Sequence, residues 1–389
     1  MKFLIVPVPS AGHLLAMVPF CWALRLAGHE ILVASRAEVV ATAQRAGLDA
    51  ADLPELAVPM DTLRNQVNPS MFPVPAFADR EAATGRGLWE VAARRWHQHA
   101  EQFLAPFARV AREWGAQVIV TDPLATLGRV LAAELGVPVV SHRWGIDPTG
   151  GPFTESTTDL LARTPGAEPV AVLDICPPGV QAPDAVPGTP MRFVPFNGTG
   201  MLPPQPVPDS RRPRVVVCFG GSVLALTGSR PLRAVVDALA RVPEIDVVVA
   251  ASAADRALLG ATPDHVRVLE QVPLQLFLPG SDLLIHHGGS TTGLTACRYG
   301  VSQLVLPQMF DQFDYARGIV RVGAGIAAED AVAQADIDGL ADSVRTLLDT
   351  PGYRAAAGAV AAALRDTPAP ATVADAVVEL LGDRVGLAA

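Results

Sequence analysis

Short apolar runs alternate with longer amphipathic stretches through the first half of the chain. The predicted strands there are Phe3–Val8, Glu30–Ala34, Val118–Thr121 and Val137–Ser141. The predicted helices are His13–Ala27, Ala37–Ala46, Leu88–Glu113 and Ala125–Leu135. Apolar strands separated by amphipathic helices are typical of an α/β fold in which helices cover both faces of a parallel sheet. We therefore expect a doubly wound, Rossmann-like domain.

A stretch rich in glycine and proline, residues 197–213, precedes a second alternating pattern and is the clearest linker candidate. The predicted strands after it are Val215–Phe219, Asp246–Ala251, Val266–Leu269, Leu283–His286 and Gln303–Leu306. A helix is predicted at Pro231–Arg241, and a helical pattern follows each of the last three strands. We expect an N-terminal domain over 1–206 and a C-terminal domain over 207–389. The final helix, Ala374–Leu381, is a candidate to pack back on the first domain.

Composition narrows the class of protein. Half of the 389 residues are apolar, enough for two buried cores, and the net charge of −9 argues against nucleic acid as a partner. Lys2 is the only lysine, which excludes a Schiff-base lysine and the lysine of a P-loop. The chain has no apolar run of membrane-spanning length and no leader pattern, so we expect a cytoplasmic protein. The four cysteines are too far apart for a metal or disulfide framework.

Two polar residues follow strands of the first half. His13 lies between the first strand and the first helix, and Asp122 ends the strand Val118–Thr121. Doubly wound folds bind ligands at the carboxyl ends of their strands, so His13 should face a cleft, where it could act as a base. Asp122 could orient His13, or it could cap the helix that follows Pro123. Position alone leaves both interpretations of Asp122 open.

The second half carries a turn that suits a phosphate. The segment His286–Thr292 reads His-His-Gly-Gly-Ser-Thr-Thr, follows a strand and opens a helix. Glycine N–H groups, hydroxyls and a helix N-terminus bind anions, and His287 could add a hydrogen bond. Asp311 and Gln312, after the next strand, suit neighbouring hydroxyl groups or the capping of their own helix. The turn Gly220–Ser222 could face the same ligand.

Metal and nicotinamide sites have little support. His286 and His287 are neighbours on a strand and should point to opposite faces, which does not suit a shared metal. Asp336 and Asp338 have the spacing that some metal-using transferases employ, but they begin a helix and are better explained as a cap with a first-turn acid. No G-x-G-x-x-G lies between a strand and a helix.

The order of these motifs resembles that of inverting glycosyltransferases of the GT-B fold. The motifs that carry the resemblance are Gly12-His13 with Pro19, Asp122-Pro123, His287–Ser290 and Asp311-Gln312. The stretches Met17–Leu24 and His142–Pro148 look most similar to actinobacterial enzymes that glycosylate aromatic polyketide antibiotics, particularly of the nogalamycin and urdamycin type. The resemblance covers nearly the whole chain. It implies two Rossmann-like domains that face each other across a cleft.

The resemblance also implies roles for matching residues. His13 would be the general base on the acceptor, and Asp122 would orient it. The residues that would bind the nucleotide sugar are Ser222, Val272, His287, Gly289, Ser290, Thr291, Asp311 and Gln312. Asp311 and Gln312 would hold the sugar, while the others hold the diphosphate and the base. The acidic residue that usually binds the ribose is Thr295 here, which fits a ribose without a 2′-hydroxyl, that is, a thymidine diphosphate (dTDP) sugar.

The acceptor side offers four candidates. Phe77 ends an exposed loop, Trp89 lies in the predicted helix Leu88–Glu113, and Trp144 follows the strand Val137–Ser141. Asp147 could promote attack by a ring carbon of a phenol, or it could be a turn residue ahead of Pro148. We prefer the turn, and with it transfer to oxygen.

The sequence thus predicts a metal-independent glycosyltransferase whose partners are a nucleotide sugar and a small, flat, largely apolar acceptor. It would need no cofactor besides its co-substrate, a dTDP-deoxysugar, and one displacement would invert the anomeric centre. Transfer to carbon and a catalytically silent nucleotide-sugar-binding homologue stay open as alternatives. An epimerase shares the architecture but would consume the donor without an acceptor. A homodimer is compatible with this interpretation.

Overall fold

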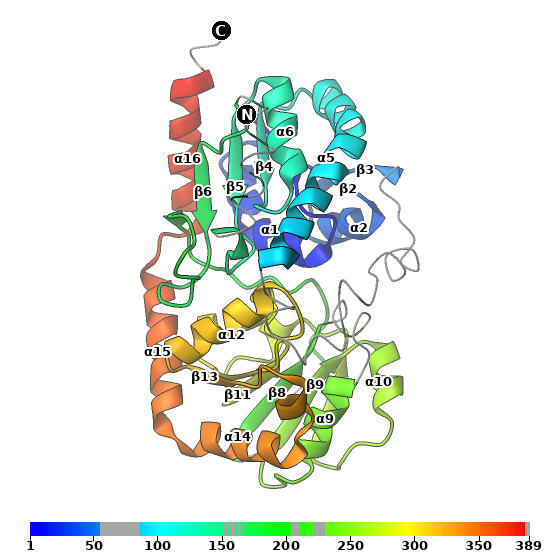
Figure 1. The fold of residues 1–389 in the computed structure, drawn as a ribbon, viewed down its shortest axis with the longest axis vertical. Helices are drawn as coiled ribbons and strands as arrows, with labels where there is room; N and C mark the ends of the chain where they lie inside the picture. The colour runs from blue at the N-terminus through cyan, green and yellow to red at the C-terminus, as the bar shows by residue number, and fades with distance from the viewer. Residues whose placement is uncertain are drawn as a thin grey trace.

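Two parallel sheets, one in each half of the molecule, form the framework of the computed structural model (Figure 1). The structure describes residues 1–54, 86–150, 155, 157, 161, 164, 166–203, 211–220, 224 and 230–385. The first sheet has the order β3-β2-β1-β4-β5-β6-β7, and the second has the order β10-β9-β8-β11-β12-β13. The boundary predicted after residue 206 falls outside the described residues and stays a prediction.

The strands of the first sheet are β1 (Lys2–Val6), β2 (Glu30–Ser35), β3 (Asp49–Asp52), β4 (Val118–Thr121), β5 (Val139–His142), β6 (Ala171–Asp174) and β7 (Thr189–Pro190). The strands of the second are β8 (Arg214–Cys218), β9 (Asp246–Ala251), β10 (Val266–Glu270), β11 (Leu283–His286), β12 (Ser302–Val305) and β13 (Gly325–Ala327). In each sheet the chain starts at the centre, runs to one edge and then returns to the other side. The predicted doubly wound α/β architecture is confirmed.

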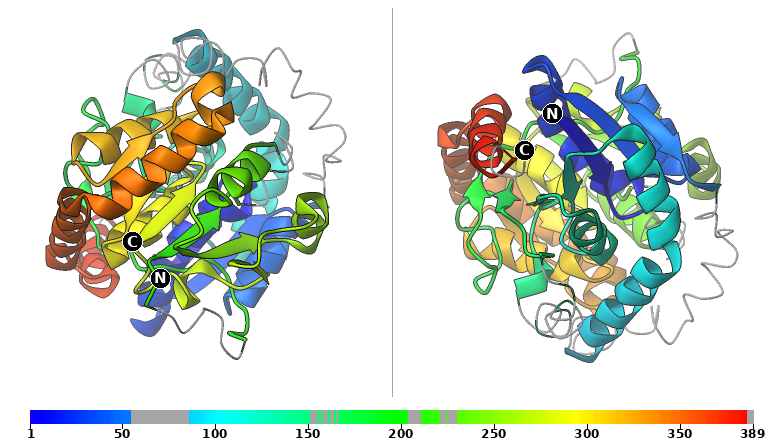
Figure 2. Two further views of the ribbon diagram at one scale, coloured as in Figure 1. Left: turned by 90° about the horizontal axis from the view of Figure 1, so that it is seen from below. Right: turned by 90° about the horizontal axis from the view of Figure 1, so that it is seen from above.

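Helices flank the strands of both sheets, as the views along the long axis show (Figure 2). The helices of the first half are α1 (Ala11–Leu26), α2 (Ala37–Arg45), α5 (Arg86–Trp114) and α6 (Thr126–Leu135). Those of the second half are α9 (Arg230–Leu239), α10 (Ala253–Leu259), α11 (Ser290–Tyr299), α12 (Asp311–Arg321), α13 (Ala331–Ala335), α14 (Ile337–Asp349), α15 (Pro351–Asp366) and α16 (Pro370–Val385). None of the described helices combines the length and the apolarity that crossing a bilayer requires.

Some short elements differ from the sequence prediction. We did not predict β3, β7 and β13, which are edge strands of their sheets, or the partly buried β6, which lies between β5 and β7. Edge strands are covered less completely than central ones, so their sequences need no continuous apolar run. The helix predicted after β10 is a single 3₁₀ turn, Leu274–Leu276. Pro273 and Pro279 bracket this segment, and proline disfavours an α-helical conformation in the residue before it.

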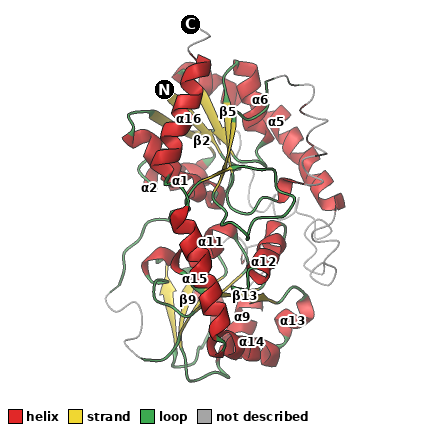
Figure 3. Cartoon of the chain, turned by 90° about the vertical axis from the view of Figure 1, so that its left-hand side faces the viewer, coloured by secondary structure: helices red, strands yellow, loops and turns green. Residues whose placement is uncertain are grey.

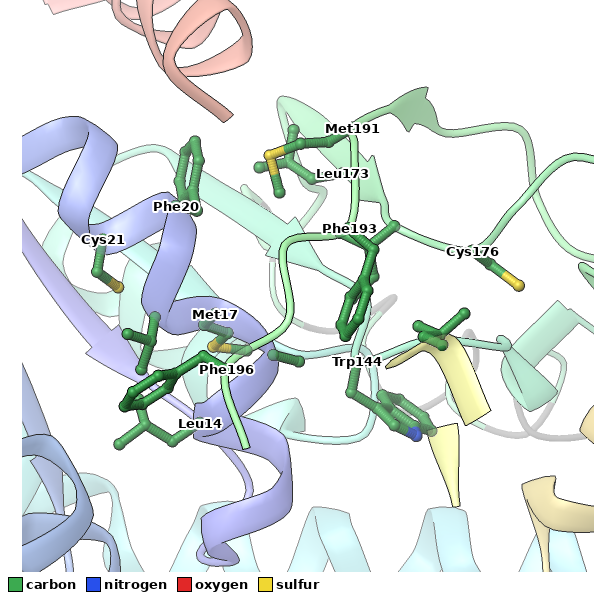
Figure 4. Close-up of a cluster of buried hydrophobic side chains, with 14 of the residues drawn as sticks. Leu14, Met17, Phe20, Cys21, Trp144, Leu173, Cys176, Met191, Phe193 and Phe196 are labelled. Atoms are coloured by element: carbon green, nitrogen blue, oxygen red, sulfur yellow. The ribbon is translucent and has the colours of Figure 1, made fainter. Parts of the chain in front are cut away.

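One apolar cluster joins the two halves, in addition to the clusters inside each half. α15 runs beside the second half and α16 beside the first (Figure 3). Val377 and Leu381 of α16 belong to the same buried cluster as Phe20 of α1 and Ile319 of α12. Figure 4 shows part of this cluster, with Trp144 at its border. Because apolar contacts continue from one half to the other, the carboxyl ends of the two sheets are held facing each other.

A fully buried arginine shapes the loop after β5. Arg143 donates from Nε to Asp147 Oδ2 at 2.6 Å and from Nη1 to Asp174 Oδ2 at 2.7 Å. Asp147 Oδ1 accepts from the Thr149 N–H at 2.8 Å. Both carboxylate oxygens of Asp147 are therefore occupied inside the protein. This arrangement supports the turn role of Asp147 and leaves its carboxylate no free oxygen for an acceptor phenol.

Replacing Arg143 with Met should destabilise the protein by about 3–5 kcal/mol, because Asp147 and Asp174 would keep buried charges without their partner. Urea or thermal unfolding, followed by circular dichroism, measures the loss. The control is Arg112→Met, which breaks an exposed ion pair with Glu134 of 2.7 Å and should cost at most about 1 kcal/mol. Equal, small losses in the two variants would contradict the importance assigned to the buried network.

Candidate active site

His13 and Asp122 meet where the first sheet changes direction. β1 and β4 are neighbouring parallel strands, so the turn after β1 and the residue after β4 lie at the same sheet edge. α1 begins at Ala11, which places His13 in its first turn. His13 Nδ1 lies 3.5 Å from Asp122 Oδ2, within ion-pair range but longer than an ordinary hydrogen bond. Such contacts often tighten only when substrate is bound.

The two oxygens of Asp122 have different partners. Oδ2, which faces His13, accepts a 2.6 Å hydrogen bond from the Val8 N–H. Oδ1 accepts from the Leu124 and Ala125 N–H groups at 3.0 and 3.2 Å. The N-cap residue of α6 is Ala125, so Asp122 closes the turn before the helix rather than capping the helix itself. One carboxylate therefore stabilises a turn and also faces His13, whereas the helix cap that the sequence offered as the alternative role of Asp122 is not formed.

His287 has the position in the second sheet that Asp122 has in the first. It follows β11, which pairs with β8, and its ring lies beside Gly220 and Gly289. A Cβ atom on Gly289 would lie 2.2 Å from His287 Nε2, so a side chain there would displace the ring. Burial lowers the pKa of His287 to about 4, which leaves the imidazole neutral at pH 7.

His286 holds the turn that follows β11. Its Nδ1 accepts from the Gly288 N–H at 3.1 Å, which places the ring proton on Nε2, 3.0 Å from Gln303 Oε1. Gly288 has φ +86°, a conformation that favours glycine. Burial, and then the neighbouring His287, lower the pKa of His286 to about 3. From the sequence, His286 was the first residue of the phosphate turn and a poor candidate for a metal ligand; its place at the end of a buried strand was the signal for a structural role.

The N-terminus of α11 lies against the His13 turn. Gly289 is the N-cap residue of α11, so Ser290 and Thr291 belong to its first turn. Thr291 Oγ1 is 3.5 Å from the carbonyl oxygen of Gly12. Val272 follows β10 and lies at the same edge of the second sheet. Ser222, the remaining candidate for the donor, lies outside the described residues.

Asp311 and Gln312 begin α12, after the next strand of the sheet. Gln312 Oε1 accepts from the Gln308 and Met309 N–H groups at 2.9 and 3.2 Å, so its carbonyl closes its own turn and its amide nitrogen takes no part in these bonds. Asp311 Oδ2 accepts from the Trp144 Nε1–H at 3.0 Å. Burial raises the pKa of Asp311, while the hydrogen bond from Trp144 acts in the opposite direction.

The acceptor-side candidates lie in different surroundings. Trp144 is buried between the two halves, with its ring 4.8 Å from that of His13. Phe77 lies outside the described residues, and so does the side chain of Trp89. Trp96 and His99, further along α5, lie beside Pro9 and line a small cavity with room for about one water molecule. Aromatic side chains of α5 thus lie beside the turn that precedes His13.

The acidic pair considered as a metal site is engaged elsewhere. Asp336 Oδ1 accepts from the Gly339 N–H at 3.0 Å and caps α14, and Asp338 pairs with Arg241. In the part of the chain that the structure describes, no three His, Cys, Asp or Glu side chains gather closely enough to hold a metal ion. Asp336 and Asp338 therefore have the helix-start role predicted from the sequence.

Comparisons with known proteins agree with this architecture. The model of the N-terminal domain of erythromycin biosynthesis protein CIII-like proteins matches residues 22–220, and that of their C-terminal domain matches residues 233–380. The elloramycin glycosyltransferase ElmGT of Streptomyces olivaceus is 36% identical over 393 residues, which cover 96% of each chain.

Solved glycosyltransferases superpose over the whole length. The spinosyn rhamnosyltransferase SpnG complexed with thymidine diphosphate gives a TM-score of 0.88 at 41% identity and covers 97% of this chain and 100% of its own. SnogD from Streptomyces nogalater gives 0.78 at 28% identity and covers 98% and 99%. The predicted GT-B fold is thereby confirmed, as is the resemblance to actinobacterial antibiotic glycosyltransferases. The chain belongs to the erythromycin biosynthesis protein CIII-like family and is a glycosyltransferase.

Proposed function

We propose that this enzyme transfers a deoxysugar from a dTDP-sugar to a hydroxyl group of a small, largely apolar, polyketide-type acceptor, with inversion. The observation that carries the proposal is the meeting of two turns. The His13 turn of the first half lies 3.5 Å from Thr291, at the N-terminus of α11 in the second half. A base on one side and an anion site on the other suit a single in-line displacement between them.

His13 is the proposed general base. With Nδ1 turned toward Asp122, Nε2 is the nitrogen that can accept the acceptor's proton. The imidazolium formed in this step would lie beside a buried carboxylate, which stabilises its positive charge. The acceptor is proposed to bind against α5, whose Trp96 and His99 lie beside Pro9 in the turn before His13. Oxygen is the proposed nucleophile, since Asp147 is engaged by Arg143.

The leaving diphosphate is proposed to bind at Gly289, Ser290 and Thr291. The first N–H groups of α11 have no partner within the helix and present partial positive charge to an anion. His287 is neutral in the free protein, and it would donate a hydrogen bond to a charged oxygen once the nearby diphosphate favours protonation of its second ring nitrogen. These groups provide the stabilisation that a magnesium ion supplies in metal-dependent transferases, so we propose that no metal takes part.

The donor nucleotide is proposed to be dTDP. Thr295 is fully buried, and its hydroxyl donates to the Thr291 carbonyl at 2.7 Å and accepts from Asn197 Nδ2 at 3.1 Å. A hydroxyl engaged in this way cannot bind the two hydroxyls of a ribose, which fits a nucleotide without the 2′-hydroxyl. SpnG, 41% identical to this chain, has been solved in complex with thymidine diphosphate.

Replacing His13 with Ala should lower kcat roughly 10²–10⁴-fold, because the acceptor would lose its base. The Kd for dTDP, measured by calorimetry, should hardly change. The control is His29→Ala, since His29 packs on Phe3 at the opposite end of β1. An unchanged kcat for His13→Ala with a hydroxyl acceptor that the wild type glycosylates would contradict the assignment.

dTDP should bind at least as tightly as uridine diphosphate. The reason is that Thr295 offers no carboxylate for a ribose diol, so the additional hydroxyl of the uridine nucleotide gains no partner there. Calorimetric titration with each nucleotide, at one salt concentration, tests the comparison. A clear preference for uridine diphosphate would show that other residues bind the ribose.

His287→Ala should weaken the binding of dTDP roughly 10- to 100-fold, the loss expected for one hydrogen bond to a charged group. Binding of thymidine, which has no phosphate, should respond little and serves as the control ligand. Turnover of the wild type should continue in excess EDTA. Activity that EDTA abolishes and magnesium restores would refute a metal-free departure of the diphosphate.

A further inference from the structure

Two adjacent residues of the first half, Trp144 and Gly145, contact the N-termini of α12 and α11 in the second half. The Trp144 indole lies against the His13 ring, with centroids 4.8 Å apart, and its Nε1–H donates to Asp311 at the start of α12. Gly145 lies against Ser290 at the start of α11. The dipeptide Trp144-Gly145 therefore touches the proposed base, sugar site and diphosphate site at once.

The contact at Gly145 requires glycine. A Cβ atom on Gly145 would lie 2.3 Å from Ser290 Cβ and 2.4 Å from Ser290 Oγ. Carbon atoms in van der Waals contact are about 3.5–4.0 Å apart, so any larger residue at Gly145 would force the two halves apart by on the order of 1 Å. The absence of a side chain at this position thus sets how closely the base can approach the donor.

The contact at Trp144 occupies only one carboxylate oxygen of Asp311. Trp144 Nε1 and Ser290 Oγ both engage Oδ2 of Asp311, at 3.0 and 3.4 Å. A carboxylate has a second oxygen with its own lone pairs, so Oδ1 can accept from the hydroxyls of a sugar while Oδ2 stays held. The bond from Trp144 therefore orients Asp311 without competing with the donor.

We propose that Trp144 and Gly145 position the donor sugar relative to the acceptor base. Trp144 orients the His13 ring and the Asp311 carboxylate through one rigid indole, and Gly145 permits the close approach of the two halves. Both are positioning residues: they act through His13, Asp311 and Ser290. The proposal rests on the function proposed above, and it gives Trp144 a role toward the donor in addition to its predicted place on the acceptor side.

Trp144→Phe tests the hydrogen bond, because phenylalanine keeps an aromatic ring beside His13 and removes the N–H. With dTDP-L-rhamnose as the donor and the spinosyn aglycone as the acceptor, kcat/KM for the donor should fall roughly 10- to 100-fold. The Kd for dTDP, which has no sugar, should change less than about twofold. A residue of merely structural importance would affect both quantities.

Trp22→Phe is the matched control. Trp22 also donates its Nε1–H, to the Ala46 carbonyl at 2.9 Å, but it lies away from the site. It should lose a similar amount of thermal stability and keep its kcat/KM. If Trp144→Phe keeps wild-type kcat/KM, loses dTDP affinity to the same degree, or behaves as Trp22→Phe does, the proposal is refuted.

Gly145→Ala tests the approach of the two halves independently. Misplacement of the reacting groups by about 1 Å can cost roughly 10²-fold, so kcat should fall by about that factor in a variant that remains folded by circular dichroism. An unchanged kcat would refute the steric part of the proposal. If the wild type transfers sugar and both variants match it, only this inference fails. If the wild type transfers no sugar from any dTDP-deoxysugar to a polyketide-type acceptor, the proposed function fails as well.

Discussion

Three backbone N–H groups and one imidazole converge on the carboxylate of Asp122, which has no exposed surface. A buried carboxylate is stable only when its oxygens are paired, and here the partners come from two separate strand ends. The Val8 N–H belongs to the loop after β1, while Leu124 and Ala125 follow β4. Asp122 therefore joins the loop after β1 to the turn after β4, and it places a negative charge beside His13. Any change of Asp122 would therefore affect both the stability of this sheet edge and the orientation of His13.

The central strands could be predicted because parallel strands covered on both faces need continuous apolar sequences. Phe3, Leu4 and Ile5 of β1 are fully buried, and the same pattern recurs in β8 and β11. The short strands that were missed, β6 and the edge strands β3, β7 and β13, are at most partly buried, and their sequences resemble loops. Periodicity reports how completely a strand is covered, so it identifies the centre of a sheet better than its edges.

The individual turns of the site could also be predicted, since each candidate directly follows a strand and parallel strands end at one sheet edge. The contacts between the halves could not. Trp144 meets Asp311, Gly145 meets Ser290, and Asn197 meets Thr295 across long separations in sequence that leave no periodic signal. Arg143 is a similar case, because a buried arginine can be understood only once the two carboxylates that surround it are known.

The anion site is built from neutral groups. Burial lowers the pKa values of His286 and His287 to about 3 and about 4, so neither ring is charged at pH 7 in the free protein. Burying permanent positive charges here would carry a large desolvation cost whenever the site is empty. Oriented N–H groups avoid that cost and need no rearrangement when negative charge develops. A diphosphate bound beside His287 favours the protonated ring and raises its pKa, so the ligand itself induces part of its countercharge. The positive charge is then greatest when the leaving group is present.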